Sequence, residues 1–430
     1  MQLPHLVSCF VVFGLTACSS SESAPSGGAS GVDAGAGASS ALSADGTPPA
    51  CTGATGGGAL PAPRGDVGGA LDPTGRRFVI FGGDVTVPIC GQSPTPKFDA
   101  ETWVLDVACG VWRSVPSGAA TPSARARHAM ATDAARGRAI LFGGRTRQGG
   151  TAYTLFDDVW AFDFAAESWS KLEVSGKGPA PRANAAMAID GDRLVVFGGN
   201  TSTNGLNFTP NNDAFVLDLT TLVWSALGSG PKPPARLFHA MAIDEAAKVA
   251  YVYGGGDEQA FTGPFLRDTW ALDLESGAWR ELKTTGDAPV PRINHGAMFD
   301  KTDGALVVFG GHDDGKLGNQ NDVYRLDVAS ARWSRVAGGD TYKNPSTGQC
   351  DFPSDFTAID KAVPERRSAF AFGPRADGRG FLAAFGKSDC GVVADAWWWS
   401  SGPSAWKALR ENPVGLSCER VSTTCKSLCN

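Results

Sequence analysis

One short motif recurs six times along this chain and constrains its fold more than any other feature. In each copy, a run of mainly aliphatic residues ends in an aromatic residue and a glycine pair. The copies are FVIFGG at 78–83, AILFGG at 139–144, LVVFGG at 194–199, AYVYGGG at 250–256, LVVFGG at 306–311 and the degenerate FLAAFGK at 381–387. Repetition of this kind predicts an array of similar structural units that pack on one another.

Two further motifs accompany every copy. Downstream lie two aromatic residues nine positions apart, which are Trp103/Trp112, Trp160/Trp169, Phe215/Trp224, Trp270/Trp279, Tyr324/Trp333 and Trp397/Trp406. Upstream lies a Pro/Arg element that ends at Arg64, Arg125, Arg182, Arg236, Arg292 and Arg366. Each unit therefore contains the same three motifs in the same order.

These motifs predict one four-stranded antiparallel sheet per repeat. The arginine element opens strand a, and the aliphatic run is strand b, whose β-branched residues suit a sheet that is buried on both faces. The two aromatic residues can lie directly opposite each other across a hairpin of strands c and d, because an odd number of positions separates them. A sheet that is apolar on both faces cannot stand alone, so six such sheets must pack radially into a ring.

The three motifs together resemble the kelch repeat, and the resemblance covers residues 60 to about 410. It implies an all-β fold, a six-bladed kelch-type β-propeller with four antiparallel strands per blade, in which strand a lines a central channel. We therefore assign residues 51–412 to the propeller. The sixth repeat departs from the pattern, because Lys387 stands in place of the second glycine and Trp398 lies outside the aromatic spacing. Trp398 would matter little for packing if it faced solvent or ligand.

The chain is acidic overall, which bears on its partners. It has 38 Lys and Arg against 44 Asp and Glu, so its net charge is −6. This balance offers no electrostatic attraction to the phosphates of a nucleic acid. Nucleic acid is therefore not an expected partner.

The N-terminus is expected to direct export. Residues 1–17 contain an apolar run that is too short to span a bilayer, as is typical of a signal peptide. Leu15-Thr16-Ala17-Cys18 resembles the bacterial lipobox, which implies lipidation at Cys18, although the preceding region lacks Lys and Arg. Residues 18–50 are rich in Ser, Gly and Ala and would form a disordered tether. We expect a lipoprotein of the outer membrane that contacts the membrane only through its lipid anchor.

The cysteines agree with export. Eight remain besides Cys9 and Cys18, namely Cys51, Cys90, Cys109, Cys350, Cys390, Cys418, Cys425 and Cys429, the last three in a tail of residues 413–430. An even number in an exported chain predicts disulfides, but eight cysteines allow 105 connectivities and the sequence does not choose among them. A bridge between Cys350 and Cys390 is one hypothesis.

Carboxylates recur at two positions of the repeat. One lies two residues before the first aromatic residue, and another lies three residues after it in five repeats. Paired carboxylates suggest glycosidase chemistry, but a feature present in every blade cannot mark one active site, and we expect these side chains to cap local backbone N–H groups. They are Glu101, Asp158, Asp213, Asp268, Asp322 and Asp395, followed by Asp106, Asp163, Asp218, Asp273 and Asp327.

Three histidines share one position of the repeat, three residues after the arginine. They are His128, His239 and His295, and on a common axis they could ligate a metal. We favour a local hydrogen-bonding role, because the other repeats carry Val67, Ala185 and Ala369 there. No metal site and no cofactor are therefore predicted.

Residues that break the repeat are the candidates for ligand binding. They lie after the glycine pairs, where the connections between strands b and c begin. The long connection of residues 337–365 is expected to form an ordered flap on the same face. We predict ligand contacts from Arg145, Asn200, Asp257, His312 and Asp313.

Two classes of function fit these features. The first is a cell-envelope binding or scaffold module that recognises a protein or a glycan through its loop face. The alternative is a sugar epimerase or mutarotase that resembles the kelch-type sialate mutarotases of bacterial periplasms. An enzyme needs acid and base groups that converge on the substrate, and no spacing here assembles them. We therefore predict no catalytic residue and favour the binding module.

Overall fold

The computed structural model describes residues 47–53, 58–86, 95–118, 120–147, 149–205, 207–260, 262–313, 318–339, 362–388 and 391–413. The chain divides into two compact units, residues 1–40 and 41–430, and every described residue belongs to the second. The predicted signal peptide, Cys18, most of the tether, the tail from residue 414 and residues 340–361 of the predicted flap lie outside the described residues.

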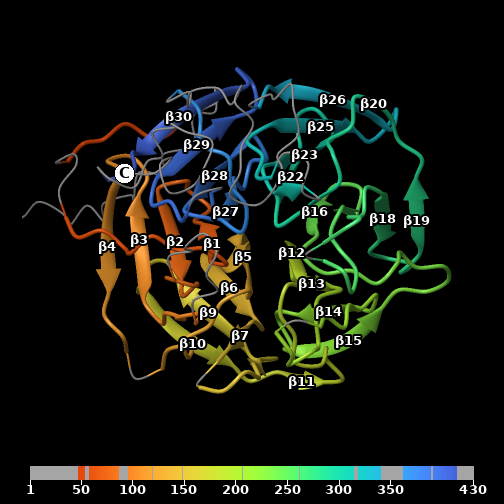
Figure 1. Cartoon of the computed structure of the whole chain (residues 1–430), viewed down its shortest axis with the longest axis horizontal. Coiled ribbons are helices and arrows are strands. Elements are labelled where there is room, and N and C mark those ends of the chain that lie inside the picture. Colours follow the sequence, from red (N-terminus) through yellow and green to blue (C-terminus); the bar gives the residue numbers. More distant parts are fainter. Residues whose placement is uncertain are drawn as a thin grey trace, which may run out of the picture. The chain divides into compact units, whose positions relative to one another are not determined.

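Six antiparallel sheets are arranged radially, as Figure 1 shows, and the predicted six-bladed propeller is confirmed. In the first three blades, strands a to d are β1 (Gly68–Leu71), β2 (Arg77–Phe81), β3 (Thr102–Asp106) and β4 (Val111–Val115); β5 (Ala129–Asp133), β6 (Arg138–Phe142), β9 (Val159–Asp163) and β10 (Ser168–Leu172); and β12 (Ala186–Asp190), β13 (Arg193–Phe197), β14 (Ala214–Asp218) and β15 (Val223–Leu227).

The last three blades repeat this order. Their strands are β16 (Ala240–Asp244), β17 (Val249–Tyr253), β18 (Thr269–Asp273) and β19 (Trp279–Leu282); β22 (Gly296–Asp300), β23 (Ala305–Phe309), β25 (Val323–Asp327) and β26 (Arg332–Ala337); and β27 (Ala371–Pro374), β28 (Gly380–Ala384), β29 (Ala396–Ser400) and β30 (Ala405–Arg410). In every blade, strand a is innermost and lines the central channel.

Blades 3 and 5 differ from the expected four strands by one short addition each. β11 (Ser175–Gly176) pairs in parallel with β15, and β20 (Thr285–Gly286) pairs in parallel with β26. Both come from the connection that enters the blade, and both cover part of an outer edge that would otherwise offer unpaired backbone groups. The remaining short elements are the pair β7 (Arg145–Thr146) and β8 (Thr154–Leu155), the pair β21 (Arg292–Ile293) and β24 (His312–Asp313), and the 3₁₀ turn η1 (Ala134–Arg136).

The glycine pairs are required where consecutive blades dock. A Cβ atom on Gly143 would lie 2.7 Å from the carbonyl oxygen of Arg182 in the next blade, and one on Gly144 would lie 2.8 Å from Cβ of His128. Both glycines also have positive φ angles, +67° and +98°. Because glycine adopts this backbone conformation without strain and leaves room for this close approach, the pair recurs in the repeat.

The sixth repeat is shifted by one residue from the predicted alignment. Arg367, not Arg366, donates to the carbonyl oxygen at the glycine position, which here is that of Phe385. Phe385 takes the place of the first glycine with a φ of +61°, and Gly386 is the second. The Phe385 ring packs on Trp112 of blade 1, with 5.2 Å between ring centroids, so the blade junction accommodates a side chain here. Lys387 therefore follows the pair and does not replace its second member.

The aromatic pairs are offset, contrary to the predicted register. Trp103 is paired with Ser114, and Trp112 is paired with Leu105, so the two rings are diagonal neighbours on one face of the sheet. The turn between strands c and d is longer than direct pairing of the rings would require. Trp398 is fully buried at 0% exposure and packs in the cluster between blades 6 and 1, so the suggestion that it faces solvent or ligand is wrong.

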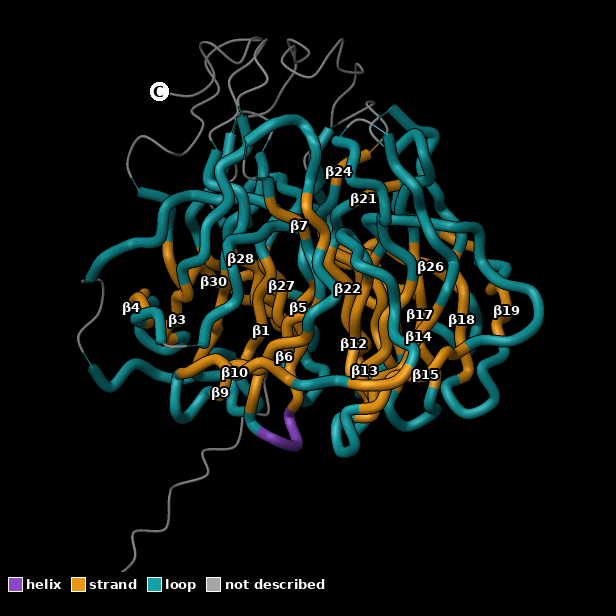
Figure 2. The backbone as a smooth tube through the Cα atoms, turned by 90° about the horizontal axis from the view of Figure 1, so that it is seen from below, coloured by secondary structure: helices purple, strands orange, loops and turns teal. Residues whose placement is uncertain are grey.

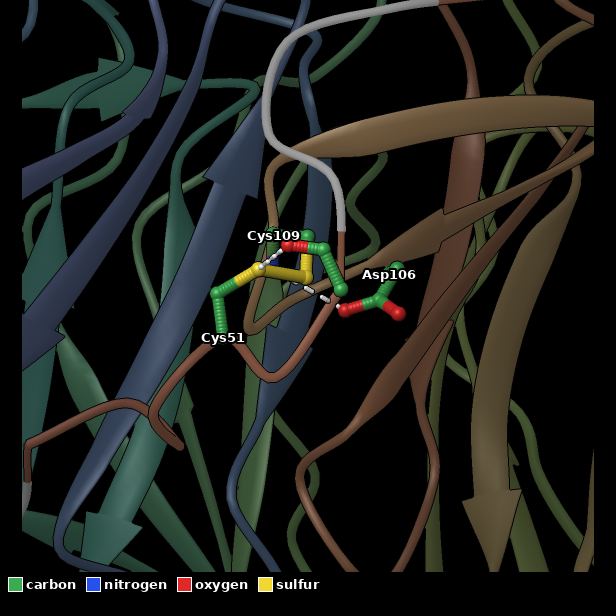
Figure 3. Close-up of a disulfide and its surroundings, with 4 residues drawn as sticks. Cys51, Asp106 and Cys109 are labelled. Carbon is green, nitrogen blue, oxygen red and sulfur yellow. Dashed lines mark hydrogen bonds between the residues drawn. A yellow bond between two sulfur atoms is a disulfide. The ribbon is translucent and has the colours of Figure 1, made fainter.

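The propeller has two different faces, seen edge-on in Figure 2. On the turn face, the a–b and c–d turns are joined by hydrogen bonds such as Val107 N–H to Arg76 O. The b–c connections, including β7 and β24, lie on the opposite loop face. A disulfide joins Cys51 to Cys109 in the c–d turn of blade 1 (Figure 3) and ties the N-terminal segment to the turn face.

Two other sequence-based points concern cysteines and membranes. Cys350 and Cys390, the hypothetical bridge, both lie outside the described residues. Among the residues that the structure does describe, no helix has the length and hydrophobicity needed to cross a bilayer.

Candidate functional site

The charged side chains that recur in every repeat form hydrogen bonds and ion pairs within their own blade. Each repeat arginine is almost fully buried and donates to the carbonyl oxygen of the first glycine position in its own blade. It also pairs with the carboxylate before the first aromatic residue, as Arg125 does with Asp158, Nη2 to Oδ2 3.0 Å. The six arginines are Arg64, Arg125, Arg182, Arg236, Arg292 and Arg367.

The structural interpretation of the repeated carboxylates is thus confirmed, by two mechanisms. The first set forms these ion pairs, and in four blades it also accepts the indole N–H of the following tryptophan. The second set caps turns as predicted, since Asp163 accepts from the backbone N–H groups of Ala165 and Ala166. Neither set is free to act on a substrate.

A ring of six residues forms the mouth of the channel on the loop face. Each lies two positions after a repeat arginine, has a φ between +51° and +59°, and donates its backbone N–H to the carbonyl oxygen of its counterpart in the preceding blade. The ring closes from blade 6 to blade 1 in the same way. We call these residues the mouth: Asp66, Arg127, Asn184, Phe238, Asn294 and Ala369, which line a pocket of about 140 Å³.

The next residue of each blade forms a waist between the mouth and the channel below, which has a volume of about 380 Å³. The waist consists of Val67, His128, Ala185, His239, His295 and Phe370. Phe370, and not Ala369, holds this position in blade 6, because of the one-residue shift described above.

The three waist histidines are buried between blades. Each ring packs edge-on against an aromatic residue of the preceding blade, as His128 does against Phe81 with 5.8 Å between centroids. Both nitrogens of His128 lack a hydrogen-bond partner, so the predicted local hydrogen-bonding role is wrong for this residue. For His239 and His295, the backbone of Phe197 and of Tyr253 supplies a hydrogen-bonding group beside the ring. Burial, assisted by the neighbouring repeat arginine, lowers the pKa of His128 and His295 to about 3 and that of His239 well below its usual value. All three are neutral at physiological pH.

A charged cluster lies where the mouth closes between blades 6, 1 and 2. Asp66 accepts from Lys387, Nζ to Oδ2 2.7 Å, and pairs with Arg127, Nε to Oδ2 3.2 Å. Burial alone would raise the pKa of Asp66, but the charges of Arg127 and Lys387 outweigh it and hold the pKa well below the usual range. Asp66 is therefore a permanent carboxylate that joins three blades.

The family follows from comparison with known proteins. The family model for the KLHDC2/KLHL20/DRC7 Kelch-repeats domain matches residues 68–262 and again residues 207–351, which together exceed half of the chain. The chain is a kelch-repeat protein. The sequence-based resemblance to the kelch repeat is thus confirmed for the propeller.

Curated relatives of this kelch protein match a little over half of the chain. Adagio-like protein 3 from Oryza sativa subsp. japonica is 31% identical over 268 residues, 60% of this chain and 39% of the relative. Acyl-CoA-binding domain-containing protein 4 from Arabidopsis thaliana is 28% identical over 258 residues, 58% of this chain and 36% of the relative. The chain therefore spans about two fifths of the length of the curated relatives it matches.

A solved structure matches a larger share of the chain. The structure of YjhT superposes with a TM-score of 0.57 and 15% identity, covering 81% of this chain and 98% of that one. At this identity the likeness concerns the fold alone.

Within the described ranges of this chain, no group of three or more His, Cys, Asp or Glu side chains is arranged to hold a metal ion.

The structure places the five predicted ligand residues around the loop face but not together. Asn200 is fully buried and its Oδ1 accepts from the backbone N–H groups of Ser202 and Thr209, which shapes its own connection. Asp313 is likewise buried and accepts from the N–H of Gly318. Asp257 accepts from the N–H of Gln259. These three side chains stabilise loops.

The other two predicted residues differ from them. His312 is partly exposed and its Nδ1 lies 3.3 Å from Oδ1 of Asn319. Arg145 is buried next to the mouth cluster, with its guanidinium 3.9 Å from the centroid of the Tyr153 ring. Of the five, Arg145 interacts electrostatically with two mouth residues, Asp66 and Arg127.

Sequence reasoning missed the mouth residues themselves. Asp66, Arg127, Asn184 and Lys387 were not predicted as ligand contacts, although the position two residues after the repeat arginine differs in chemistry from blade to blade. Comparing the six repeats at that position would have found the first three. Lys387 was hidden by the one-residue shift in the sixth repeat.

Proposed function

We propose that this kelch protein is a binding module of the cell envelope that takes a protein or glycan ligand at the mouth of its channel. The observation that carries the proposal is a contrast in hydrogen bonding. Every repeated charge is paired within its blade, whereas Nδ2 of Asn184 at the mouth and both nitrogens of His128 at the waist are buried without partners. Since buried polar groups are otherwise almost always paired, these atoms are available to a ligand.

The rigidity of the mouth supports the same proposal. Its six residues are fixed by the closed ring of backbone hydrogen bonds, so a ligand would meet groups that are already ordered and would avoid part of the entropy cost of binding. A sugar mutarotase is the less favoured alternative, because the mouth carboxylate, Asp66, is committed to two ion pairs and is a poor general base.

The mouth can be tested with substitutions that keep the backbone. Asn184→Gly and Asn294→Gly remove side chains at left-handed residues, and Ala331→Gly makes the matched change at a left-handed residue of a c–d turn. The full chain would be screened on a glycan microarray and on a displayed library of random heptapeptides. We expect any bound probe to lose at least about tenfold affinity, or about 1.4 kcal/mol, in a mouth variant and none in Ala331→Gly.

Two results would contradict this. One is the absence of binding to either library. The other is a bound probe that is insensitive to both asparagine substitutions but sensitive to Ala331→Gly, which would move the functional surface to the turn face.

The proposed location rests on Cys18. If this residue is lipidated, Cys18→Ser should move the protein from the membrane fraction to the soluble fraction of the envelope without changing its thermal unfolding, because Cys18 is outside the propeller. Acyl chains anchor by burying methylene groups in the bilayer. Fractionation with immunoblotting measures the result, and unchanged membrane retention of Cys18→Ser would refute the anchor.

A further inference from the structure

The channel below the waist is an apolar cavity that extends to the turn face. Its walls are the innermost strands of the blades, and between the waist and the a–b turns they present mainly alanine, glycine, methionine and other apolar residues. Thr132 is the polar exception among the described lining residues of this stretch, and its hydroxyl already donates to the carbonyl oxygen of Leu71 at 2.7 Å. A cavity with such walls offers few partners to water and favours apolar ligands.

The waist ends the channel towards the loop face without a charge. Phe370 and the three histidines of the waist line both the channel and the mouth pocket. Burial lowers the pKa of His128 and His295 to about 3, so their rings are neutral at neutral pH. Below them lie methionines such as Met130 and Met187, whose flexible thioether chains adapt to irregular shapes. The apolar end of a ligand can therefore lie at the waist without contacting a charged group.

The dimensions of the channel suit one extended alkyl chain. Strand a has five residues in β5, β12 and β16, so the apolar stretch is about 17 Å long at 3.4 Å per residue. The volume of about 380 Å³ lies within the range of small-molecule sites. Ala131 and Ala188 are partly exposed although they belong to innermost strands. Their exposed methyl groups border the channel, and a ligand there would remove this apolar surface from water.

The turn-face end of the channel carries more positive than negative charge. The charged residues that line it are Lys301 and Arg375 against Glu245. Lys301 Nζ donates to Glu245 Oε2 at 2.9 Å and to the carbonyl oxygen of Ala376 at 2.9 Å. The Lys301 and Glu245 side chains are 36% and 48% exposed, and so exposed an ion pair contributes little to stability. Lys301 can therefore turn to an anionic group that a ligand leaves at this end.

We propose that the channel binds a free fatty acid, with its alkyl chain between the innermost strands and its carboxylate beside Lys301 on the turn face. The apolar walls hold the chain, and the charges at the rim select a negative head group over a positive one. Each methylene group buried in the channel should raise the affinity about fourfold. This site is separate from the mouth, so the inference goes beyond the proposed function and does not depend on it.

The test titrates the full chain with even-numbered fatty acids from octanoate to hexadecanoate, below their micelle concentrations, and follows binding by calorimetry. We expect one bound molecule per chain and an affinity that rises about fourfold per methylene group. The rise should stop once the alkyl chain is as long as the channel, about 17 Å. Dodecyltrimethylammonium has an alkyl chain of similar length but a positive head group, and it should bind more weakly than dodecanoate.

Filling the channel should remove the site. Ala131→Leu/Ala188→Leu adds two larger side chains to the wall and should weaken dodecanoate binding at least about tenfold, or about 1.4 kcal/mol. Ala166→Leu, the matched change at an exposed residue of a c–d turn, should have no effect. If the double variant does not fold, Ala188→Val fills less of the channel and should still weaken binding. Lys301→Met should weaken the binding of dodecanoate but not that of dodecanol, which has no charge.

Three results would overturn the inference: no stoichiometric binding of any fatty acid, an affinity that does not depend on chain length, or equal binding by the wild type and a folded channel-filling variant. Binding of dodecanoate by Cys18→Ser but not by the chain purified from membranes would mean that the protein's own acyl chain occupies the channel, and the assignment to a free fatty acid would be wrong. Asn184→Gly and Asn294→Gly should bind dodecanoate as the wild type does, which separates this site from the mouth.

Discussion

Replacing His128 with phenylalanine is expected to make the propeller less sensitive to acid. The unfolded chain protonates each histidine near pH 6.5, whereas folded His128 and His295 resist protonation down to about pH 3 because they are buried beside arginines. The contribution of each to stability is therefore complete above about pH 6.5 and is lost as the pH falls towards 3. Between pH 7.5 and pH 5 this amounts to about 2 kcal/mol of unfolding free energy per histidine.

The His128→Phe substitution is conservative because one blade of the propeller already has phenylalanine at the waist position. Phe370 occupies the equivalent waist position in blade 6 and is also buried. Urea unfolding at pH 7.5 and pH 5 should show that the wild type loses about 2 kcal/mol more than His128→Phe over this interval. His312→Phe, at a partly exposed residue of the loop face, serves as the control and should behave as the wild type. Equal losses in wild type and His128→Phe would mean that His128 is protonated in the folded state.

Breaking one repeated ion pair should destabilise the whole ring. Arg292 and Asp322 are buried in blade 5, with 0% and 10% of their side chains exposed. Arg292→Met would leave the Asp322 carboxylate and the carbonyl oxygen of Gly310 without their donor. Removing one partner of a buried pair costs about 3–5 kcal/mol. We expect a loss of this size in the free energy of unfolding, measured with urea at pH 7.5.

The same blade offers a matched exposed pair. Arg325 and Asp303 are 2.7 Å apart with 32% and 44% of their side chains exposed, and Arg325→Met should cost at most about 1 kcal/mol. The double variant Arg292→Met/Asp322→Leu should recover part of the stability lost in Arg292→Met, since no buried charge remains unpaired. If Arg292→Met and Arg325→Met proved equally mild, the repeat arginine would not be a structural element of the blade.

The fold could be predicted because its causes are local and repeated. The aliphatic run of strand b, the glycine pair and the two aromatic residues recur with nearly constant spacing, so six copies identified the same sheet and any error in one copy was visible against the others. The exception is blade 6, where Phe385 takes a glycine's place and the motif could be aligned in two ways. A side chain at this position is tolerated only because Trp112 of blade 1 offers it a packing surface, which depends on ring closure.

Pairing across the sheet was harder to predict than the strands themselves. The spacing of Trp103 and Trp112 is compatible with direct or diagonal pairing, and the length of the turn between β3 and β4 decides in favour of the diagonal. Likewise the burial of Trp398 follows from its contact with the neighbouring blade. Neither the strand register nor the contact of Trp398 with the next blade can be predicted from the spacing of residues in the repeat.

What the sequence determined by itself was thus the repeating unit: the number of blades, the order of their strands, and the division between residues that serve the fold and residues that break the pattern. The tertiary structure alone decided which of the latter meet. Asp66, Arg127 and Lys387 form ion pairs at the mouth although Asp66 and Lys387 lie 321 positions apart in the sequence. Asn200 and Asp313 instead accept hydrogen bonds from backbone N–H groups of their own loops. Closure of the ring brings the first and last blades together, and a contact made by closure leaves no local periodicity in the sequence from which it could be predicted.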